Sequence, residues 1–244
     1  MTSAAVRHLK RADPVLARVI ERVGPCRLAV QSSGTHLDHI VRAIVYQQLS
    51  GKAARTIHSR LLALFDTGAP SPRELIGLSD AALRGAGLSR QKIGYLRDLA
   101  QRAAGGDVPL DALDTLDDEA VIAALTRIKG VGRWTAHMFL IFRLGRLNVL
   151  PELDLGIRKA IQVAYRLRQL PDAERVHRIG QSWAPYASVA SWYLWRSLDG
   201  ASPARRRKAK RAGTPDFTSC YKAWKKESDD VVFACEPAQE LVVA

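Results

Sequence analysis

The stretch RIKGVGRWTAHMFLIFRLGRLNVLPELDLGIRKA, residues 127–160, contains the features that decide the fold. Gly130 and Gly132 lie between two segments whose apolar residues recur at the three- and four-residue spacing of helices. Glycine permits the positive φ of a sharp turn and allows a ligand to approach the backbone closely. The pattern therefore predicts two helices joined by a tight hairpin. A carboxylate set between two leucines, Asp154, follows the second helix.

Composition limits the class of protein and its partners. The chain has 244 residues, of which 47% are hydrophobic, enough for one large domain or two small lobes with a buried core. Its formal net charge of +13 favours a polyanionic partner, above all nucleic acid, although a merely solvated basic surface is the alternative. We find no signal-peptide pattern at the N-terminus and no apolar run long enough to span a bilayer.

The number and spacing of the cysteines limit which metal sites the chain can form. Cys26, Cys220 and Cys235 are odd in number and widely spaced, so alone they do not complete a four-thiolate zinc or iron–sulfur site. A disulfide framework is not expected, and a reducing cytoplasm is the simplest location. We therefore predict a protein that requires no cofactor.

Helix-capping residues recur along the chain, whereas strand-type alternation is nearly absent. Gly51 is expected to interrupt or kink a long helical stretch, and Pro185 suits the first turn of a late helix. These signals predict an all-α fold over residues 1–202, followed by a basic tail over 203–244 that is solvated or contacts phosphates. Caps are expected at Thr35 with Asp38, at Ser89, at Thr115 with Asp118, and at Asp172.

The predicted hairpin suits a phosphate group. The N–H groups from about Gly130 to Thr135 open a helix, where the positive end of the helix dipole attracts an anion. Lys129 and Arg133 add positive charge beside them. An ordinary turn between helices explains Gly-Val-Gly equally well. On the other side of the turn, three backbone carbonyls are candidates for a bound Na⁺ or K⁺, those of Thr126, Ile128 and Val131.

Taken together, four stretches resemble the helix–hairpin–helix DNA glycosylase superfamily. IKGVGRWTA and LNVLPELDLGIRKA match its hairpin and later aspartate, here Asp154. AIVYQQLSGKAA and WAPYASVASWYLW are similar to the branch of 3-methyladenine DNA glycosylase II. The resemblance covers roughly residues 10–200. It implies a two-lobed helical fold with an active-site cleft between the lobes and the helix–hairpin–helix at about 121–144.

The resemblance implies an enzyme that hydrolyses the N-glycosidic bond of a flipped, alkylated base in duplex DNA. Asp154 would stabilise the positive charge that develops on the sugar, and it would also suit the cap of a helix starting near Leu155. Trp134 stands where glycosylases that also cut the DNA backbone carry a lysine, so a monofunctional enzyme is implied. The alternatives are a glycosylase with lyase activity and a non-catalytic lesion-binding protein.

The same resemblance assigns residues to the DNA and to the base. Gln48 would fill the gap left by the flipped nucleotide, with Gln47 close by, although a helix end with two solvated glutamines is the alternative. Ring faces for a cationic base such as 3-methyladenine would add about 1–2 kcal/mol of cation–π attraction. The candidates for this base pocket are Trp134, Trp195 and Tyr46, with Met138 where relatives can carry an aromatic residue, and Trp183 either in the pocket or in the core.

Other residues set the expected breadth of function. Leu88 would plug the opposite strand or be buried, and Trp192 is expected in the core. Leu153 precedes Asp154 where a second acid can occur, and Ala187 stands where relatives often carry a basic residue, so the range of bases is open. The expected partner is double-stranded DNA containing alkylated bases, and the expected state is a monomer.

Overall fold

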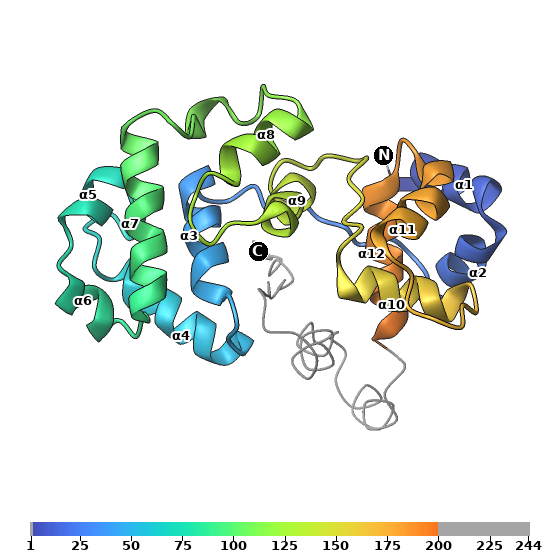
Figure 1. The fold of residues 1–244 in the computed structure, drawn as a ribbon, viewed down its shortest axis with the longest axis horizontal. Coiled ribbons are helices and arrows are strands. Elements are labelled where there is room, and N and C mark those ends of the chain that lie inside the picture. The colour runs from blue at the N-terminus through green and yellow to red at the C-terminus, as the bar shows by residue number, and fades with distance from the viewer. Residues whose placement is uncertain (1, 200–244) are drawn as a thin grey trace, which may run out of the picture. The chain divides into compact units, whose positions relative to one another are not determined.

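The structure, a computed structural model, describes residues 2–199, which form helices and connecting turns without a β-strand (Figure 1). The predicted all-α class is confirmed. Within the same residues, no helix is long and apolar enough to cross a membrane. The basic segment 203–244, with Cys220 and Cys235, lies outside the described residues.

The described chain divides into two compact units, and the chain enters the first unit, passes to the second and returns. Unit 1 consists of residues 2–30 and 145–199, and unit 2 of residues 31–144. Unit 1 contains α1 (Thr2–Ala12), α2 (Pro14–Val23), α10 (Leu155–Ala164), α11 (Ala173–Gly180), the 3-10 turn η2 (Gln181–Trp183) and α12 (Ala187–Leu198).

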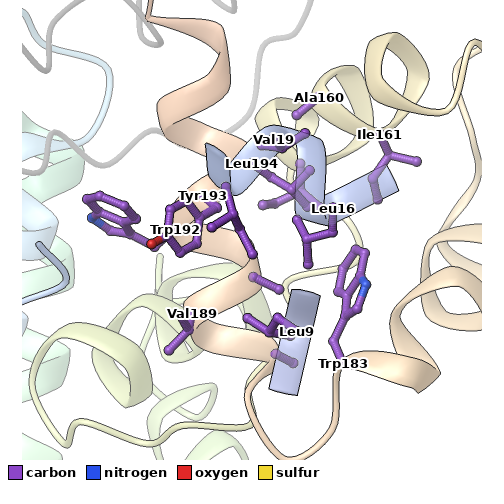
Figure 2. Packing of buried hydrophobic residues seen from close by; sticks show 14 of the residues in the cluster. Leu9, Leu16, Val19, Ala160, Ile161, Trp183, Val189, Trp192, Tyr193 and Leu194 are labelled. Carbon is purple, nitrogen blue, oxygen red and sulfur yellow. The ribbon is translucent and has the colours of Figure 1, made fainter. Parts of the chain in front are cut away.

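Both chain segments of unit 1 contribute to one apolar core. Leu9 and Leu16 of the N-terminal segment are fully buried with Ile161 of α10 and Leu194 of α12 (Figure 2). Burying one such side chain contributes about 1.5–3 kcal/mol, so the first two helices are integral to the packing of the last three. The core therefore fixes α10 and α12 against each other.

Asp13 joins three parts of this core. Its Oδ1 caps α2 by accepting two backbone N–H groups, and its Oδ2 accepts from Trp183 Nε1 at 2.8 Å and from the Tyr165 hydroxyl. A buried indole N–H needs a partner, and Asp13 supplies it. Trp183 is fully buried in this core (Figure 2), which was one of its two expected places, and Trp192 is in the core as expected.

Unit 2 is built around its longest helix, α7, which packs against α3, α5 and α6 (Figure 1). This packing makes α7 the element against which the other segments of the unit are positioned. The unit contains α3 (His36–Tyr46), α4 (Gly51–Leu62), α5 (Pro72–Gly77), α6 (Asp80–Gly85), α7 (Arg90–Ala104), the 3-10 turn η1 (Leu110–Ala112), α8 (Asp118–Leu125) and α9 (Arg133–Phe142).

Most of the predicted caps are confirmed. Thr35 and Asp38 form a reciprocal capping box on α3, Ser89 caps α7, and Asp172 caps α11. The expected cap at Thr115 with Asp118 is wrong, because Asp117 accepts the Ala120 N–H at 2.8 Å. The Thr115 hydroxyl instead donates to a carbonyl of the preceding turn.

The structure also decides the expected helix boundaries at Gly51 and Pro185. The long helical stretch is interrupted next to Gly51 rather than kinked, which was one of the two expectations: α3 ends at Tyr46, and α4 begins at Gly51 behind its N-cap Ser50. Pro185 precedes α12, which begins at Ala187, so it is not in the first helical turn. Pro185 thus stands outside the helix that it was expected to begin, whereas Gly51 is the first residue of α4.

Candidate functional site

The predicted hairpin joins α8 to α9 in unit 2. A hydrogen bond from Val131 N–H to Ile128 O, at 3.0 Å, closes the turn. Gly132 is the N-cap of α9, and the first intrahelical bond runs to its carbonyl from Ala136 N–H at 3.1 Å. The amides of residues 133–135 precede that bond and lie at the positive end of the helix dipole. The turn thus has the geometry that favours an anion.

The two glycines of the hairpin serve different purposes. Gly130 has φ +79°, and a Cβ there would lie 2.3 Å from ring carbons of Tyr95. Gly132 has φ −96°, and a Cβ there would meet no atom within 4 Å. The fold itself therefore requires glycine only at position 130. The open space at Gly132 leaves room for a ligand beside the backbone.

The hairpin is fastened to α7 and to the end of α3. Asp98 Oδ2 accepts the Lys129 N–H at 2.8 Å and Arg102 Nε at 2.9 Å. Burial alone would raise the pKa of Asp98, but these hydrogen bonds and both cationic side chains bring it below its usual value. Gln47 Nε2 donates to Gly130 O at 2.7 Å. The turn is thus held by hydrogen bonds to the Lys129 N–H and the Gly130 carbonyl, and the Tyr95 ring lies against Gly130.

The side chains around the turn differ in accessibility. Lys129 is 71% exposed, with its Nζ 3.8 Å from Asp98 Oδ1. Arg133 makes a two-pronged ion pair with Glu119, at 2.7 and 3.1 Å, and its hydrogen bonds hold the pKa of Glu119 below its usual value. Thr135 is 4% exposed, and in the described part of the chain its Oγ1 has no hydrogen-bond partner. Thr135 can therefore offer a ligand its backbone amide rather than its hydroxyl.

The turn after α3 separates the two glutamines. Gln47 is 4% exposed, so the alternative of two solvated glutamines is wrong for this residue. Gln48 is exposed and has φ +56°, a left-handed conformation unusual for a residue with a side chain. Lys92 Nζ, from α7, donates to Val45 O and to Gln47 O, each at 2.7 Å. The structure thus brings Gln47 to the hairpin and leaves Gln48 at the surface.

In unit 1, Asp154 is the N-cap of α10, which confirms its expected role as a helix cap. Its Oδ1 accepts the Ile157 N–H at 2.7 Å and Trp195 Nε1, from α12, at 2.9 Å. A Cβ at Gly156 would lie 3.0 Å from Asp154 Oδ1 and 3.1 Å from Trp195 Cδ1. Two directional hydrogen bonds and one absent methyl group therefore fix this half-buried carboxylate against an indole.

The remaining candidates for a base pocket lie in unit 2. Trp134 is half-buried at the second position of α9. Tyr46 and Met138 are buried; the Arg42 guanidinium lies 4.8 Å from the Tyr46 ring centroid, and Met138 lines a cavity of about 30 Å³. Within their own unit, Tyr46 and Met138 are thus core residues, and contact with a flipped base stays a prediction. Leu88 is buried, which was one of its two expected fates.

The predicted cation site can be judged from its carbonyls. Ile128 O accepts one N–H, which leaves its second lone pair for a cation. The Thr126 hydroxyl turns back to donate to Ile122 O at 2.7 Å, so only the Thr126 carbonyl is a candidate ligand. Carbonyl oxygens are of the ligand type that Na⁺ and K⁺ bind, and the site at Thr126, Ile128 and Val131 stays a prediction.

Several residues that position the site were not identified from the sequence. Gly156 had a signal, because glycine inside a helix costs up to about 1 kcal/mol and needs a structural reason. Lys92, Tyr95 and Asp98 had none: they belong to an ordinary amphipathic helix, and their partners lie far away in sequence. Helix α7 is thus the unanticipated support of the hairpin and of the turn after α3.

Comparisons with known proteins match these features to DNA repair proteins. Residues 41–185 match the family described as HhH-GPD superfamily base excision DNA repair protein. The chain is 33% identical over 215 residues to DNA-3-methyladenine glycosylase 1 of Schizosaccharomyces pombe, covering 85% of this chain and 93% of that protein. Its structure is similar to that of 3-methyladenine DNA glycosylase from the same yeast in complex with abasic DNA, with a TM-score of 0.70, 34% identity, and coverage of 80% and 96%. It is also similar to DNA-3-methyladenine glycosidase of Bacillus halodurans, with a TM-score of 0.73, 35% identity, and coverage of 81% and 90%.

Proposed function

This chain belongs to the HhH-GPD superfamily of base excision DNA repair proteins, and we propose that it is a monofunctional DNA glycosylase for alkylated bases. Its substrates are 3-methyladenine and related N-alkyl purines in double-stranded DNA. The observation that carries this proposal is the carboxylate of Asp154, which Ile157 N–H and Trp195 Nε1 hold in one orientation.

Hydrolysis of the N-glycosidic bond adds water across the bond between C1′ and the base nitrogen. As that bond breaks, its electrons leave with the base and positive charge develops on the sugar. The Asp154 carboxylate stabilises this charge, accepts the proton of the attacking water and passes it to solvent. Because Asp154 is fixed before the substrate arrives, little reorganisation is needed during the reaction.

The choice of base follows from its charge. A purine nucleotide alkylated at a ring nitrogen, such as 3-methyladenine, has a cationic base that becomes neutral when it leaves, so it needs no strong general acid. The half-buried rings of Trp134 and Trp195 offer electron-rich faces, and cation–π attraction favours a cationic base by about 1–2 kcal/mol. A Schiff base with the sugar requires an amine, and position 134 holds tryptophan rather than lysine. These features support base release without cleavage of the DNA backbone.

DNA binding is assigned to unit 2. The amides that open α9, from Arg133 to Thr135, receive a phosphate, and the open space at Gly132 lets it approach. The exposed Lys129 adds charge, and Na⁺ or K⁺ at the Thr126, Ile128 and Val131 carbonyls would add more. Gln48 fills the stack after a nucleotide is flipped. Such phosphate contacts position the protein without reading sequence.

The decisive experiment measures free base released from methylated duplex DNA by the parent chain and by Asp154→Asn. The asparagine oxygen can accept the same two hydrogen bonds, so the variant removes the charge while keeping the cap. We expect release by the parent and a loss of at least about 100-fold in the variant, with DNA affinity retained. Glu152→Gln, which removes a carboxylate from the same loop, is the matched control and should retain parental activity.

Three outcomes would contradict the proposal. An Asp154→Asn variant as active as the parent would make the residue a helix cap only. A parent that binds lesions but releases no alkylated base would be a lesion sensor. A covalent adduct with DNA trapped by borohydride would indicate a lyase, which the tryptophan at position 134 argues against.

A further inference from the structure

The ammonium group of Lys92 makes an unusual contact at the end of α3. Lys92 is half-buried, and its Nζ donates to Val45 O and Gln47 O, both at 2.7 Å. The last carbonyls of a helix lack intrahelical partners, and a cation placed there also complements the helix dipole. A side chain from α7 thus caps α3 in a place where water would otherwise serve.

The turn that Lys92 holds contains a strained residue. Gln48 follows directly and has φ +56°, a conformation that costs a non-glycine residue about 1–3 kcal/mol and persists only where its surroundings impose it. Before Gln48, Lys92 fixes the Gln47 carbonyl and Gly130 O fixes the Gln47 side chain. After it, Ser50 caps α4. The exposed Gln48 therefore stands between two anchored ends.

We propose that Lys92 is a positioning residue that holds the Gln48 turn in the conformation that fills the gap left by a flipped nucleotide. This inference rests on the proposed function, because it assumes that Gln48 enters the DNA stack. Lys92 itself touches neither the base nor the sugar.

Burial of a lysine side chain at this position is energetically unfavourable, which supports a specific role for its charged group. Burial lowers the pKa of Lys92 to about 8, so the folded chain desolvates an ammonium group at neutral pH. A methionine would pack the same aliphatic stem without that penalty, but it would leave both carbonyls without their donor. The hydrogen bonds to Val45 O and Gln47 O therefore explain the ammonium group better than the packing of the aliphatic chain does.

Helix α7 provides a matched control of the same chemistry. Arg97, five residues after Lys92, donates to Leu75 O, Ile76 O and Leu78 O around the end of α5. Arg97→Met thus removes a second cation that caps a helix in the same unit, but away from the Gln48 turn. A general loss of stability would affect both variants, whereas a loss of stack filling should affect only Lys92→Met.

The first readout does not depend on base release. Dissociation constants are measured for an undamaged duplex and for the same duplex carrying a tetrahydrofuran abasic analogue, which has a gap in its stack. We expect the parent to prefer the abasic duplex, and Lys92→Met and Gln48→Ala each to lose about tenfold of that preference, since a less populated competent turn lowers apparent affinity in proportion. Lys92→Arg should recover part of the preference, and Arg97→Met should keep it.

The second readout separates stack filling from chemistry. Release of methylated base is compared between a duplex and the same oligonucleotide as a single strand, where no paired stack has to be filled. Lys92→Met should lower the duplex-to-single-strand ratio by about tenfold, and the double variant with Gln48→Ala should lose no more than Gln48→Ala alone, because the two residues act as one unit.

Each outcome decides the inference. Parental ratios in Lys92→Met, or additive losses in the double variant, would overturn it, as would a parent without any preference for the abasic duplex. If the parent prefers the abasic duplex through Lys92 but releases no base, the glycosylase proposal fails and the positioning role stands. If the parent releases base and Lys92→Met keeps both ratios, the positioning role alone fails.

Discussion

Alanine at Gly130 should destabilise the chain, whereas alanine at Gly132 should weaken DNA binding instead. At Gly130, φ +79° is a left-handed conformation that costs alanine about 1–2 kcal/mol. The added Cβ would lie 2.3 Å from ring carbons of Tyr95, well inside van der Waals contact, and overpacking of this kind costs about 1–3 kcal/mol. The sum is about 2–5 kcal/mol.

The measurement is the midpoint of thermal unfolding, followed by circular dichroism. For a chain of this size, the expected loss lowers the midpoint by roughly 4–20 °C. The double variant Gly130→Ala/Tyr95→Ala should be more stable than the two single losses predict, because removal of the ring relieves the overlap. A Gly130→Ala variant that unfolds within about 2 °C of the parent would refute this steric reasoning.

Gly132→Ala is the matched control in the same turn. Its φ of −96° is ordinary and no atom lies within 4 Å of the added Cβ, so the loss should be about 0.5 kcal/mol, the difference between glycine and alanine at an N-cap. If a phosphate approaches this position, the methyl group should lower DNA affinity with the fold intact. Equal destabilisation by both alanines would contradict the conclusion that the fold requires glycine at position 130 and not at position 132.

Three further predictions concern charge. Burial, and then the nearby Arg42, lower the pKa of His58 to about 4, so the unfolding free energy should fall as the pH drops from 6.5 to 4, when the unfolded chain binds the extra proton. Urea titrations of the parent and His58→Gln across this range should show a shallower fall in the variant, and identical slopes would exclude His58 as the cause. Asp98→Asn should unfold at lower urea concentration at neutral pH, and its deficit should shrink as the pH falls through the lowered pKa of Asp98, where the parent loses its charge-assisted bonds; a deficit that stays constant in acid would contradict the sign of that shift. Glu119→Gln should raise affinity for duplex DNA by up to about fivefold at low salt, because it removes an exposed competitor for Arg133, and unchanged binding isotherms would show that this ion pair does not oppose phosphate binding.

Local signals in the sequence predicted most of the helix caps, in which the interaction spans only three residues. The caps at Ser89 and Asp172, and the capping box at Thr35, are bonds between a side chain and the first turn of its own helix, so they can be read without the fold. The same locality explains the error at α8, where adjacent residues of capping type stand together. In the structure the preceding turn ends at a point that makes Asp117 the N-cap of α8.

Tertiary structure decided which of several similar residues belongs to the site. The sequence offered both Trp183 and Trp195 as candidates for the base pocket, yet packing gives the first to Asp13 in the core and the second to Asp154. Lys92 reaches carbonyls 45 and 47 residues earlier in the chain, and no local pattern records such a partner. The sequence alone determined the all-α class, the hairpin and the cap at Asp154, because these depend on periodicity and on short-range bonds. The orientation of the acid and the support of the hairpin depend on which helices pack together, which only the folded chain settles.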